Sequence, residues 1–112
     1  MAFTKDYARE ALRRTDVDAL RGPVVLEFGT GWCGFCLAAQ PLLARVLTNH
    51  TSVRHIKVED GPRRPLGRSF GVKLWPTLIF MRDGHEVSRL VRPGDQERVE
   101  RALAAITAPT PT

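Results

Sequence analysis

The sequence predicts an α/β fold: a mixed central β-sheet, with a parallel βαβ half and an antiparallel hairpin half, flanked by helices on both faces. Three observations lead to this prediction. Residues 23–28 form a nearly continuous apolar run, which is typical of a strand covered on both faces. A helical pattern follows at residues 33–47. Two β-like runs, residues 77–81 and 86–90, then flank Asp83-Gly84, a pair that favours a tight hairpin turn.

The N-terminal part, residues 1–22, is the least defined. Residues 15–18, Thr-Asp-Val-Asp, fit a capping box, which favours a short helix from about Asp16 to Leu20. The segment 7–12 fits a strand and a helix equally well. The apolar strand at 23–28 comes directly after this part of the chain.

The helix expected at residues 33–47 contains Pro41, which removes one backbone hydrogen bond and should kink it. Residues 53–58 then alternate between apolar and polar side chains, as a strand does. The connection 61–71 is rich in proline, glycine and arginine, with one helical turn near 66–70. A right-handed crossover makes the first two strands and the helix between them a parallel unit.

The last helix is predicted by apolar residues at the spacing i, i+3, i+4, i+7, which are Val99, Ala102, Leu103 and Ile106. Asp95 precedes them and can cap the first turn. Residues 108–112, rich in threonine and proline, are expected to be disordered. We therefore expect a single domain over residues 1–107.

Length and composition agree with a small globular protein. The 112 residues are 43% hydrophobic, enough for a single core. No stretch reaches the roughly 18 apolar residues of a membrane span, and no apolar segment follows Met1 as in a secretory signal. The expectation is a cytoplasmic monomer with no membrane association.

The formal net charge is +5, and arginine outnumbers lysine. The arginines are scattered, with a loose cluster at Arg63-Arg64 and Arg68, and no aromatic residues are interleaved with them. A stacking platform for bases would need such aromatic residues, and a scattered basic surface usually only keeps a protein soluble, so nucleic-acid binding is not expected here. A preference for acidic partner surfaces fits the charge better.

The only two cysteines, Cys33 and Cys36, are three residues apart at the predicted start of a helix. Unpaired backbone N–H groups and the helix dipole stabilise a thiolate at this position. A second thiol one turn along can attack a mixed disulfide formed by the first. The arrangement predicts dithiol–disulfide exchange, with Cys33 as the more exposed nucleophile and Cys36 as the resolving thiol. The alternative is a pair of inert core cysteines.

A metal site is the rival interpretation. Cys33 and Cys36, followed by His50 and His55, come close to the spacing of a Cys2His2 zinc finger. However, the second cysteine already belongs to a helix, and His55 lies in the alternating run 53–58. We therefore expect no metal, and we interpret both histidines as surface or strand-end residues.

Over residues 22–107 the chain resembles the thioredoxin family. The family signature is a strand ending in an acidic residue, then Trp-Cys-Gly-x-Cys, a proline further along the helix, and a later Pro-Thr before an apolar strand. In this chain these features are Glu27, Trp32-Cys33-Gly34-Phe35-Cys36, Pro41 and Pro76-Thr77. The resemblance implies the thioredoxin-like fold and the corresponding redox activity.

Glu27 is an ionisable residue in a strand expected to be buried, where desolvation would raise its pKa. The family has an aspartate here that exchanges a proton with the resolving cysteine through water, and the resemblance implies this role for Glu27. The alternative is a strand-edge glutamate that points at solvent. Lys57 matches a family lysine close to the buried acid, so it either pairs with Glu27 or is simply exposed.

The resemblance also implies a substrate groove. In the family, the proline equivalent to Pro76 is cis and packs against the cysteine pair, and the residue before it binds an extended substrate segment. A trans proline that starts a strand is the alternative. The substrate-binding residues implied are Trp32, Gly34, Phe35, Trp75, Pro76 and Thr77.

Three departures from the family pattern affect the expected activity. Phe35 replaces the proline of the most reducing members, so we predict a reduction potential less reducing than the roughly −270 mV of thioredoxin. Trp75 is bulkier than the usual aliphatic residue, and it either narrows the groove or forms an aromatic patch with Trp32 and Phe35. Residues 91–93, Val-Arg-Pro, stand where the family has a glycine-containing stretch, which suggests a basic rim and a different client set.

The leading hypothesis is a thiol–disulfide oxidoreductase that reduces disulfides of protein clients. It needs no metal or organic cofactor beyond its redox-active cysteine pair, and a separate reductase supplies the electrons. One alternative is a thioredoxin-like binding module or redox switch with little turnover. Another is a disulfide oxidase or isomerase.

Overall fold

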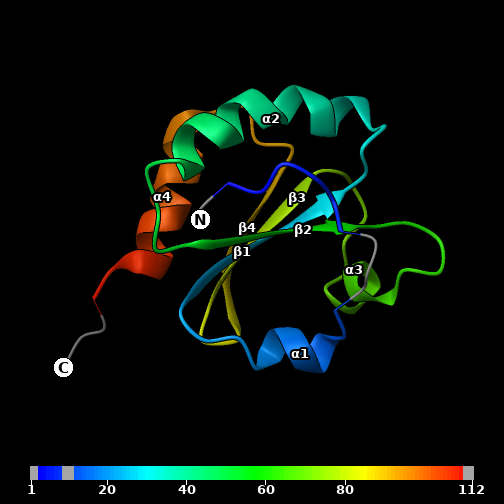
Figure 1. Ribbon diagram of the computed structural model, residues 1–112, viewed down its shortest axis with the longest axis horizontal. Coiled ribbons are helices and arrows are strands. Elements are labelled where there is room, and N and C mark those ends of the chain that lie inside the picture. Colours follow the sequence, from blue (N-terminus) through cyan, green and yellow to red (C-terminus); the bar gives the residue numbers. More distant parts are fainter. Residues whose placement is uncertain (1–2, 9–11, 110–112) are drawn as a thin grey trace.

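The computed structural model describes residues 3–8 and 12–109 and contains a four-stranded sheet with helices on both faces (Figure 1). The elements in chain order are α1 (Arg14–Asp18), β1 (Pro23–Gly29), α2 (Gly34–Leu47), β2 (Arg54–Glu59), α3 (Pro65–Ser69), β3 (Thr77–Arg82), β4 (His85–Val91) and α4 (Gln96–Thr107). The strand order is β2-β1-β3-β4. β1 and β2 are parallel, whereas the β1–β3 and β3–β4 pairs are antiparallel. The predicted mixed sheet is confirmed.

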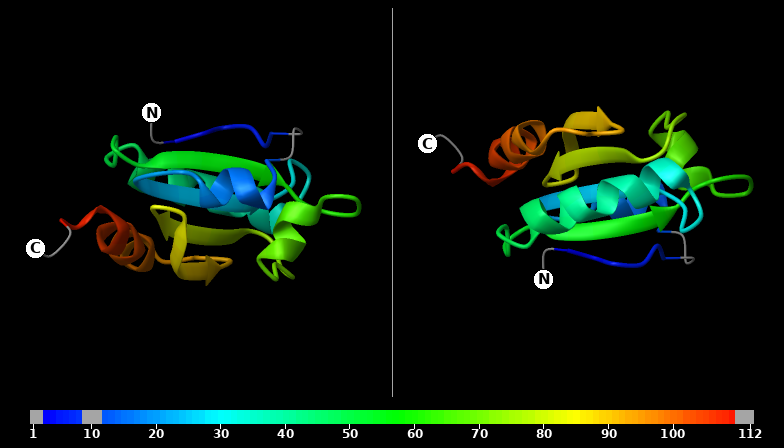
Figure 2. Two further views of the ribbon diagram at one scale, coloured as in Figure 1. Left: turned by 90° about the horizontal axis from the view of Figure 1, so that it is seen from below. Right: turned by 90° about the horizontal axis from the view of Figure 1, so that it is seen from above.

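The central strands are apolar on both sides because each side of the sheet is covered by helices (Figures 1 and 2). Val25 of β1 packs in a cluster with residues of α2 and α4. The neighbouring Val24 and Leu26 point the opposite way and pack with residues of α1 and α3. Residues of β1 at odd positions, including position 27, therefore face the α2 side of the sheet.

Local signals in the sequence locate α2, α4 and the hairpin well. α2 continues through Pro41 to Leu47, and α4 is capped by Asp95, whose side chain accepts a hydrogen bond from the Glu97 amide at 2.8 Å. The β3–β4 turn has positive φ at both central residues, 50° at Asp83 and 81° at Gly84. A Cβ atom at Gly84 would also collide with the backbone carbonyl of Asp18. The turn therefore requires glycine for two reasons.

The predicted helix at Asp16–Leu20 begins too late. α1 starts at Arg14 because Asp16 acts as the third residue of the first turn, where its carboxylate accepts a hydrogen bond from the Arg13 amide at 2.9 Å. Of the segment 7–12, residues 9–11 lie outside the described residues. Ala8 forms a parallel bridge to β2, with its amide donating to the Lys57 carbonyl at 2.8 Å.

Most of the C-terminal tail predicted at residues 108–112 also lies outside the described residues, which end at 109. Within the described ranges, none of the helices has the length and apolar character needed to cross a bilayer. Residues 3–8 lie alongside β2, on the side of the sheet that α2 covers (Figure 1).

Candidate active site

The two cysteines lie at the N-terminal end of α2, shortly after β1 ends. Cys33 is the N-cap of α2, and its Sγ atom accepts a hydrogen bond from the backbone N–H of Cys36 at 3.2 Å. Both thiols are free. The exposed fraction is 8% for Cys33 and 1% for Cys36, so the predicted order of exposure is confirmed, although Cys33 is also largely buried. The N-terminal amide of the helix points at the sulfur that should become an anion.

Cys36 is more deeply buried than Cys33, and the pKa of its thiol is high. Burial raises the pKa of its thiol, the adjacent Cys33 thiol adds to the effect, and the pKa reaches about 11. At neutral pH this thiol is therefore protonated. If Cys36 is to attack as a thiolate, a nearby group must accept its proton.

Glu27 is completely buried on the α2 side of β1, which excludes the solvent-facing alternative. Its Oε2 atom accepts hydrogen bonds from the Tyr7 hydroxyl at 2.7 Å and from the Gln40 amide at 2.9 Å. Its Oε1 atom lies 2.8 Å from Nε2 of His55. The carboxylate is thus held by donors from three different segments of the chain.

The predicted rise in the pKa of Glu27 is wrong. Burial does raise it, but the hydrogen bonds from His55, Gln40 and Tyr7, with His55 contributing most, outweigh burial and hold the pKa below its ordinary value. The sequence shows that the strand is buried but not which donors meet the carboxylate. Glu27 is accordingly ionised at neutral pH.

The prediction that His55 is a surface or strand-end residue is also wrong. Its side chain is fully buried, and its Nδ1 atom accepts a hydrogen bond from the Thr4 amide at 2.8 Å. Because Nδ1 is an acceptor, the ring proton is on Nε2, which donates to Glu27. The alternating pattern of β2 did not reveal this burial. In an alternating strand the polar residues are expected to face solvent, but here His55 and Lys57 both point toward the α2 side of the sheet.

The four residues with zinc-finger spacing do not converge. His50 is half-buried and pairs with Glu100 of α4, with 2.9 Å between its Nε2 and Oε2 of the glutamate. His55 pairs instead with Glu27. In the part of the chain that the structure describes, no group of three or more His, Cys, Asp or Glu residues is placed to hold a metal ion.

Lys57 is buried, with an exposed fraction of 3%, so the exposed alternative is wrong. Its Nζ atom donates to the Lys5 carbonyl at 2.5 Å and to Oε1 of Gln40 at 2.8 Å. The Gln40 amide donates in turn to Glu27, so the predicted pairing is relayed through Gln40. Burial lowers the pKa of Lys57, which the negative charge of Glu27 partly offsets.

Tyr7, Gln40 and His55 are site residues that the sequence analysis missed. Gln40 could have been found from the sequence, because it lies one helical turn after Cys36. In the structure its side-chain amide donates to the Cys36 carbonyl at 2.8 Å. Tyr7 had no such signal. Its hydroxyl and the Cys36 Sγ both abut Gly29, where a Cβ atom would lie 2.6 Å and 2.5 Å from them. Only glycine leaves room for both atoms.

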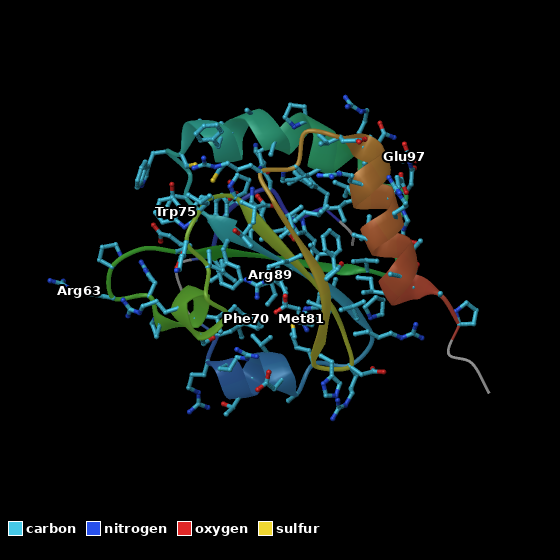
Figure 3. The ribbon with its side chains drawn as sticks, turned by 180° about the vertical axis from the view of Figure 1, so that it is seen from behind. Arg63, Phe70, Trp75, Met81, Arg89 and Glu97 are labelled. Atoms are coloured by element: carbon cyan, nitrogen blue, oxygen red, sulfur yellow. The ribbon has the colours of Figure 1, made fainter. Side chains whose placement is uncertain are left out.

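The loop before β3 lies beside the start of α2, and Figure 3 shows its Trp75 there. The peptide bond between Trp75 and Pro76 is cis, as predicted. The Trp75 ring packs edge-on against Trp32, with centroids 5.7 Å apart, and its Nε1 donates to Asp60 at 2.8 Å. Thr77 follows as the buried first residue of β3. The aromatic patch predicted for Trp75 therefore forms with Trp32.

Phe35 has a different neighbour, the predicted basic rim residue Arg92. The Arg92 guanidinium lies 3.8 Å from the centre of the Phe35 ring, a cation–π contact. Its Nε donates to the Trp75 carbonyl at 2.8 Å, and its backbone N–H donates to the Pro76 carbonyl at 2.9 Å. Gly34, the first residue of α2, is exposed beside Phe35. One arginine thus joins the cysteine motif to the cis-proline loop.

A cavity of about 810 Å³ opens between the N-terminal segment and α2. Its lining includes Tyr7 and Lys57 on one side and Cys36 and Gln40 on the other. Solvent can therefore approach the resolving cysteine from the side that Tyr7 and Lys57 occupy.

The thioredoxin family model matches residues 7–105. Thioredoxin of Mycobacterium tuberculosis is 32% identical over 95 residues, which cover 82% of this chain and 80% of that protein. Thioredoxin H-type 1 of Nicotiana tabacum is 30% identical over 86 residues, covering 77% and 68%. The solved structure of thioredoxin 2 from Pseudomonas aeruginosa PAO1 in its reduced form has a TM-score of 0.83 and 55% identity, and covers 93% of this chain and 96% of that one. The chain belongs to the thioredoxin family and is a protein disulfide oxidoreductase.

Proposed function

We propose that this protein works in the reducing direction and breaks disulfide bonds in protein clients. The observation that carries the proposal is the hydrogen bond from the Cys36 amide to the Cys33 Sγ at the start of α2. It stabilises the thiolate of the cysteine that lies nearer to solvent. The high pKa of Cys36, about 11, keeps the second thiol from competing for the client.

The reaction takes two exchange steps. The Cys33 thiolate attacks a client disulfide, forming a mixed disulfide and releasing one client sulfur as a thiolate. Cys36 then gives its proton to Glu27 and attacks Cys33 Sγ, which releases the second client sulfur. The client gains two electrons, and this chain is left with a Cys33–Cys36 disulfide. A separate reductase returns the two electrons, so no bound cofactor is required.

We choose Glu27 as the acceptor of the Cys36 proton because Glu27 is ionised and lies in the same buried site as Cys36. Lys57 supports it through Gln40, which donates to the carboxylate while accepting from the lysine ammonium at 2.8 Å. The positive charge of Lys57 lowers the cost of keeping a carboxylate in this buried site. We assign Glu27 to proton transfer and Lys57 to its electrostatic support.

We assign client binding to the surface around Cys33, made of Trp32, Gly34, Phe35 and Trp75. Pro76 and Thr77, which we also assign to this site, are buried. Arg92 adds an exposed positive charge at this surface, above the Phe35 ring. A cation beside the attacking sulfur favours client segments with acidic side chains next to their disulfide. The scattered positive charge of the chain, +5 overall, acts in the same direction.

Insulin reduction with a chemical dithiol as electron donor tests the proposal. Wild type should accelerate insulin precipitation, and Cys33→Ser should abolish the acceleration. Cys36→Ser should also turn over poorly, but it should hold clients covalently on Cys33, which a non-reducing gel detects. A wild type without turnover would contradict the proposal and favour a binding module or redox switch.

The direction of the reaction is tested by the reduction potential. Because Phe35 replaces proline in the motif, we expect a potential between roughly −270 and −120 mV, on the less reducing side of thioredoxin. Equilibration of the purified protein with glutathione buffers measures it. A potential at the oxidising end of this range would favour an oxidase or isomerase instead.

A further inference from the structure

The hydroxyl group of Tyr7 lies between the two groups that must exchange a proton. It donates a hydrogen bond to Oε2 of Glu27 at 2.7 Å. Its oxygen also lies beside the Cys36 thiol, and each of the two groups influences the pKa of the other. Gly29 supports the arrangement, because the Tyr7 Oη and Cys36 Sγ both pack against its backbone on the side where a Cβ atom would be.

The hydrogen-bonding capacity of a phenol fits this position. A tyrosine hydroxyl has one proton to donate and lone pairs that can accept. The ionised carboxylate of Glu27 can only accept, so the Tyr7 proton points at Glu27. The lone pairs of Tyr7 are then available to the S–H group of Cys36. With the Cys36 S–H group turned toward the Tyr7 oxygen, each donor in the series Cys36, Tyr7 and Glu27 would meet an acceptor.

We propose that the Tyr7 hydroxyl relays the proton from Cys36 Sγ to Glu27 Oε2 when Cys36 resolves the mixed disulfide. The relay rests on the proposed function and adds a catalytic residue to it. Cys36 passes its proton to the Tyr7 oxygen while Tyr7 passes its own proton to Glu27, so that Tyr7 is unchanged. The Cys36 thiolate forms a bond to Cys33 Sγ, the bond between Cys33 and the client breaks, and the client sulfur departs as a thiolate.

Tyr7 acts in this scheme by concerted transfer and not as a free base. Burial, followed by the negative charge of Glu27, raises its pKa far above the ordinary value, so a separate phenolate does not form. The groups facing the hydroxyl and its partners are Glu27 from β1, Cys36 and Gln40 from α2, and His55 and Lys57 from β2. Lys57 lies with its Nζ atom 4.3 Å from the centre of the Tyr7 ring. The positive charge of Lys57 stabilises the ionised Glu27 carboxylate before the proton is transferred.

The relay replaces a water molecule with a fixed protein group. The cavity of about 810 Å³ that reaches Tyr7 and Cys36 can admit water, so a variant without the hydroxyl keeps a slower route. Removal of the hydroxyl should therefore slow the resolving step without abolishing it. This makes the proposal measurable.

Tyr7→Phe tests the relay, because it keeps the ring and removes only the hydroxyl. The reduced protein is mixed with excess dithiodipyridine in a stopped-flow instrument. The first equivalent of thiopyridone reports the attack of Cys33 and depends on reagent concentration. The second equivalent reports the attack of Cys36 and does not. We expect the first step to be unchanged and the second to slow by roughly 10- to 100-fold, at or below the lower end of general acid–base effects.

Matched variants show whether the hydroxyl acts through Glu27. Glu27→Gln should slow the second step to a similar extent, and the double variant should be no slower than the slower single one, because both changes break one chain. Phe3→Leu alters a neighbouring aromatic side chain of the same N-terminal segment that carries no hydroxyl, and it should resolve at the wild-type rate. Cys36→Ser should release only the first equivalent, which identifies the second phase.

The pH profile of the second step distinguishes proton relay from a structural role. In wild type the rate should be nearly flat from neutral to mildly alkaline pH, because Glu27 is already ionised. In Tyr7→Phe it should rise by roughly tenfold per pH unit, as the thiolate fraction of Cys36 does below its pKa. Cys33 does not titrate in this step because it is in the mixed disulfide.

The relay is overturned if Tyr7→Phe resolves at the wild-type rate, or if both steps slow together with no change in the pH profile. Either result leaves the proposed function standing so long as wild type releases both equivalents. If wild type itself releases no second equivalent, the proposed function fails instead. The two failures are therefore distinguishable in one experiment.

Discussion

The Nε2 atom of His55 lies 2.8 Å from the Oε1 atom of Glu27, and neither side chain is exposed to solvent. The two residues come from adjacent parallel strands, in which Val25 pairs with His55 and Glu27 with Lys57. Because side chains alternate along a strand, His55 and Lys57 both face the same side of the sheet as Glu27. This register gathers the buried polar groups behind the cysteine pair.

Glu27→Ala should destabilise the protein strongly. It removes the acceptor of hydrogen bonds from Tyr7, Gln40 and His55 and the largest of the negative charges that act on the buried Lys57. We expect a loss of about 3–5 kcal/mol in the free energy of unfolding, measured by urea titration at neutral pH. Glu27→Gln retains the volume and a carbonyl acceptor, so its loss should be about 1–3 kcal/mol. Equal small losses in both variants would contradict the assigned contacts.

The ionisation of Glu27 should make stability fall at acid pH. Its pKa is lower in the folded protein than the ordinary 4.5, so in the pH range between the two values the unfolded state binds more protons. The stabilisation is complete above the ordinary pKa and is lost as the pH falls toward the folded-state value. Urea titrations of wild type and Glu27→Gln across this range should show a steeper loss in wild type. Parallel curves would contradict a lowered pKa.

The two cysteines should differ greatly in alkylation. With a pKa of about 11, Cys36 is almost entirely protonated at neutral pH, and it is nearly inaccessible. Limiting iodoacetamide added to the reduced protein should therefore modify Cys33 first, with Cys36 labelled at least about 10-fold less. Peptide mass spectrometry after a short reaction measures the ratio. Similar labelling of both residues would contradict the assignment of nucleophile and resolving thiol.

Arg92 should determine client charge preference. Arg92→Ala removes the guanidinium above Phe35 and the hydrogen bond to the Trp75 carbonyl. For two peptide disulfides that differ only in acidic or basic flanking residues, we expect the kcat/KM ratio favouring the acidic peptide to fall by about 5- to 10-fold. Arg101→Ala makes the same charge change at an exposed position of α4, next to Glu97 of the same helix, and should leave the ratio unchanged. An unchanged ratio in Arg92→Ala would show that Arg92 does not discriminate between acidic and basic clients.

Much of the fold follows from short-range patterns in the sequence. Apolar runs and turn residues located β1, β3 and β4, and i, i+3, i+4 spacing located α4. The position of Cys33 and Cys36 at a helix start needed only the pattern around them. α1 was misplaced because its capping box can be read from two starting residues, and only the bond between Arg13 and Asp16 selects one.

The sequence by itself determined the order of strands and helices and the position of the cysteine pair, because neighbouring residues decide helix starts, strands and turns. The cis proline at position 76 followed only from the resemblance to the thioredoxin family. Only the tertiary structure decided the electrostatics of the site. Glu27 contacts Tyr7, 20 residues before it in the chain, and His55, 28 residues after it. These contacts lower its pKa, whereas burial alone would raise it. The continuous apolar pattern of β1 shows that this strand is buried, whereas the donors that stabilise a buried charge come from strands and helices that only folding brings together.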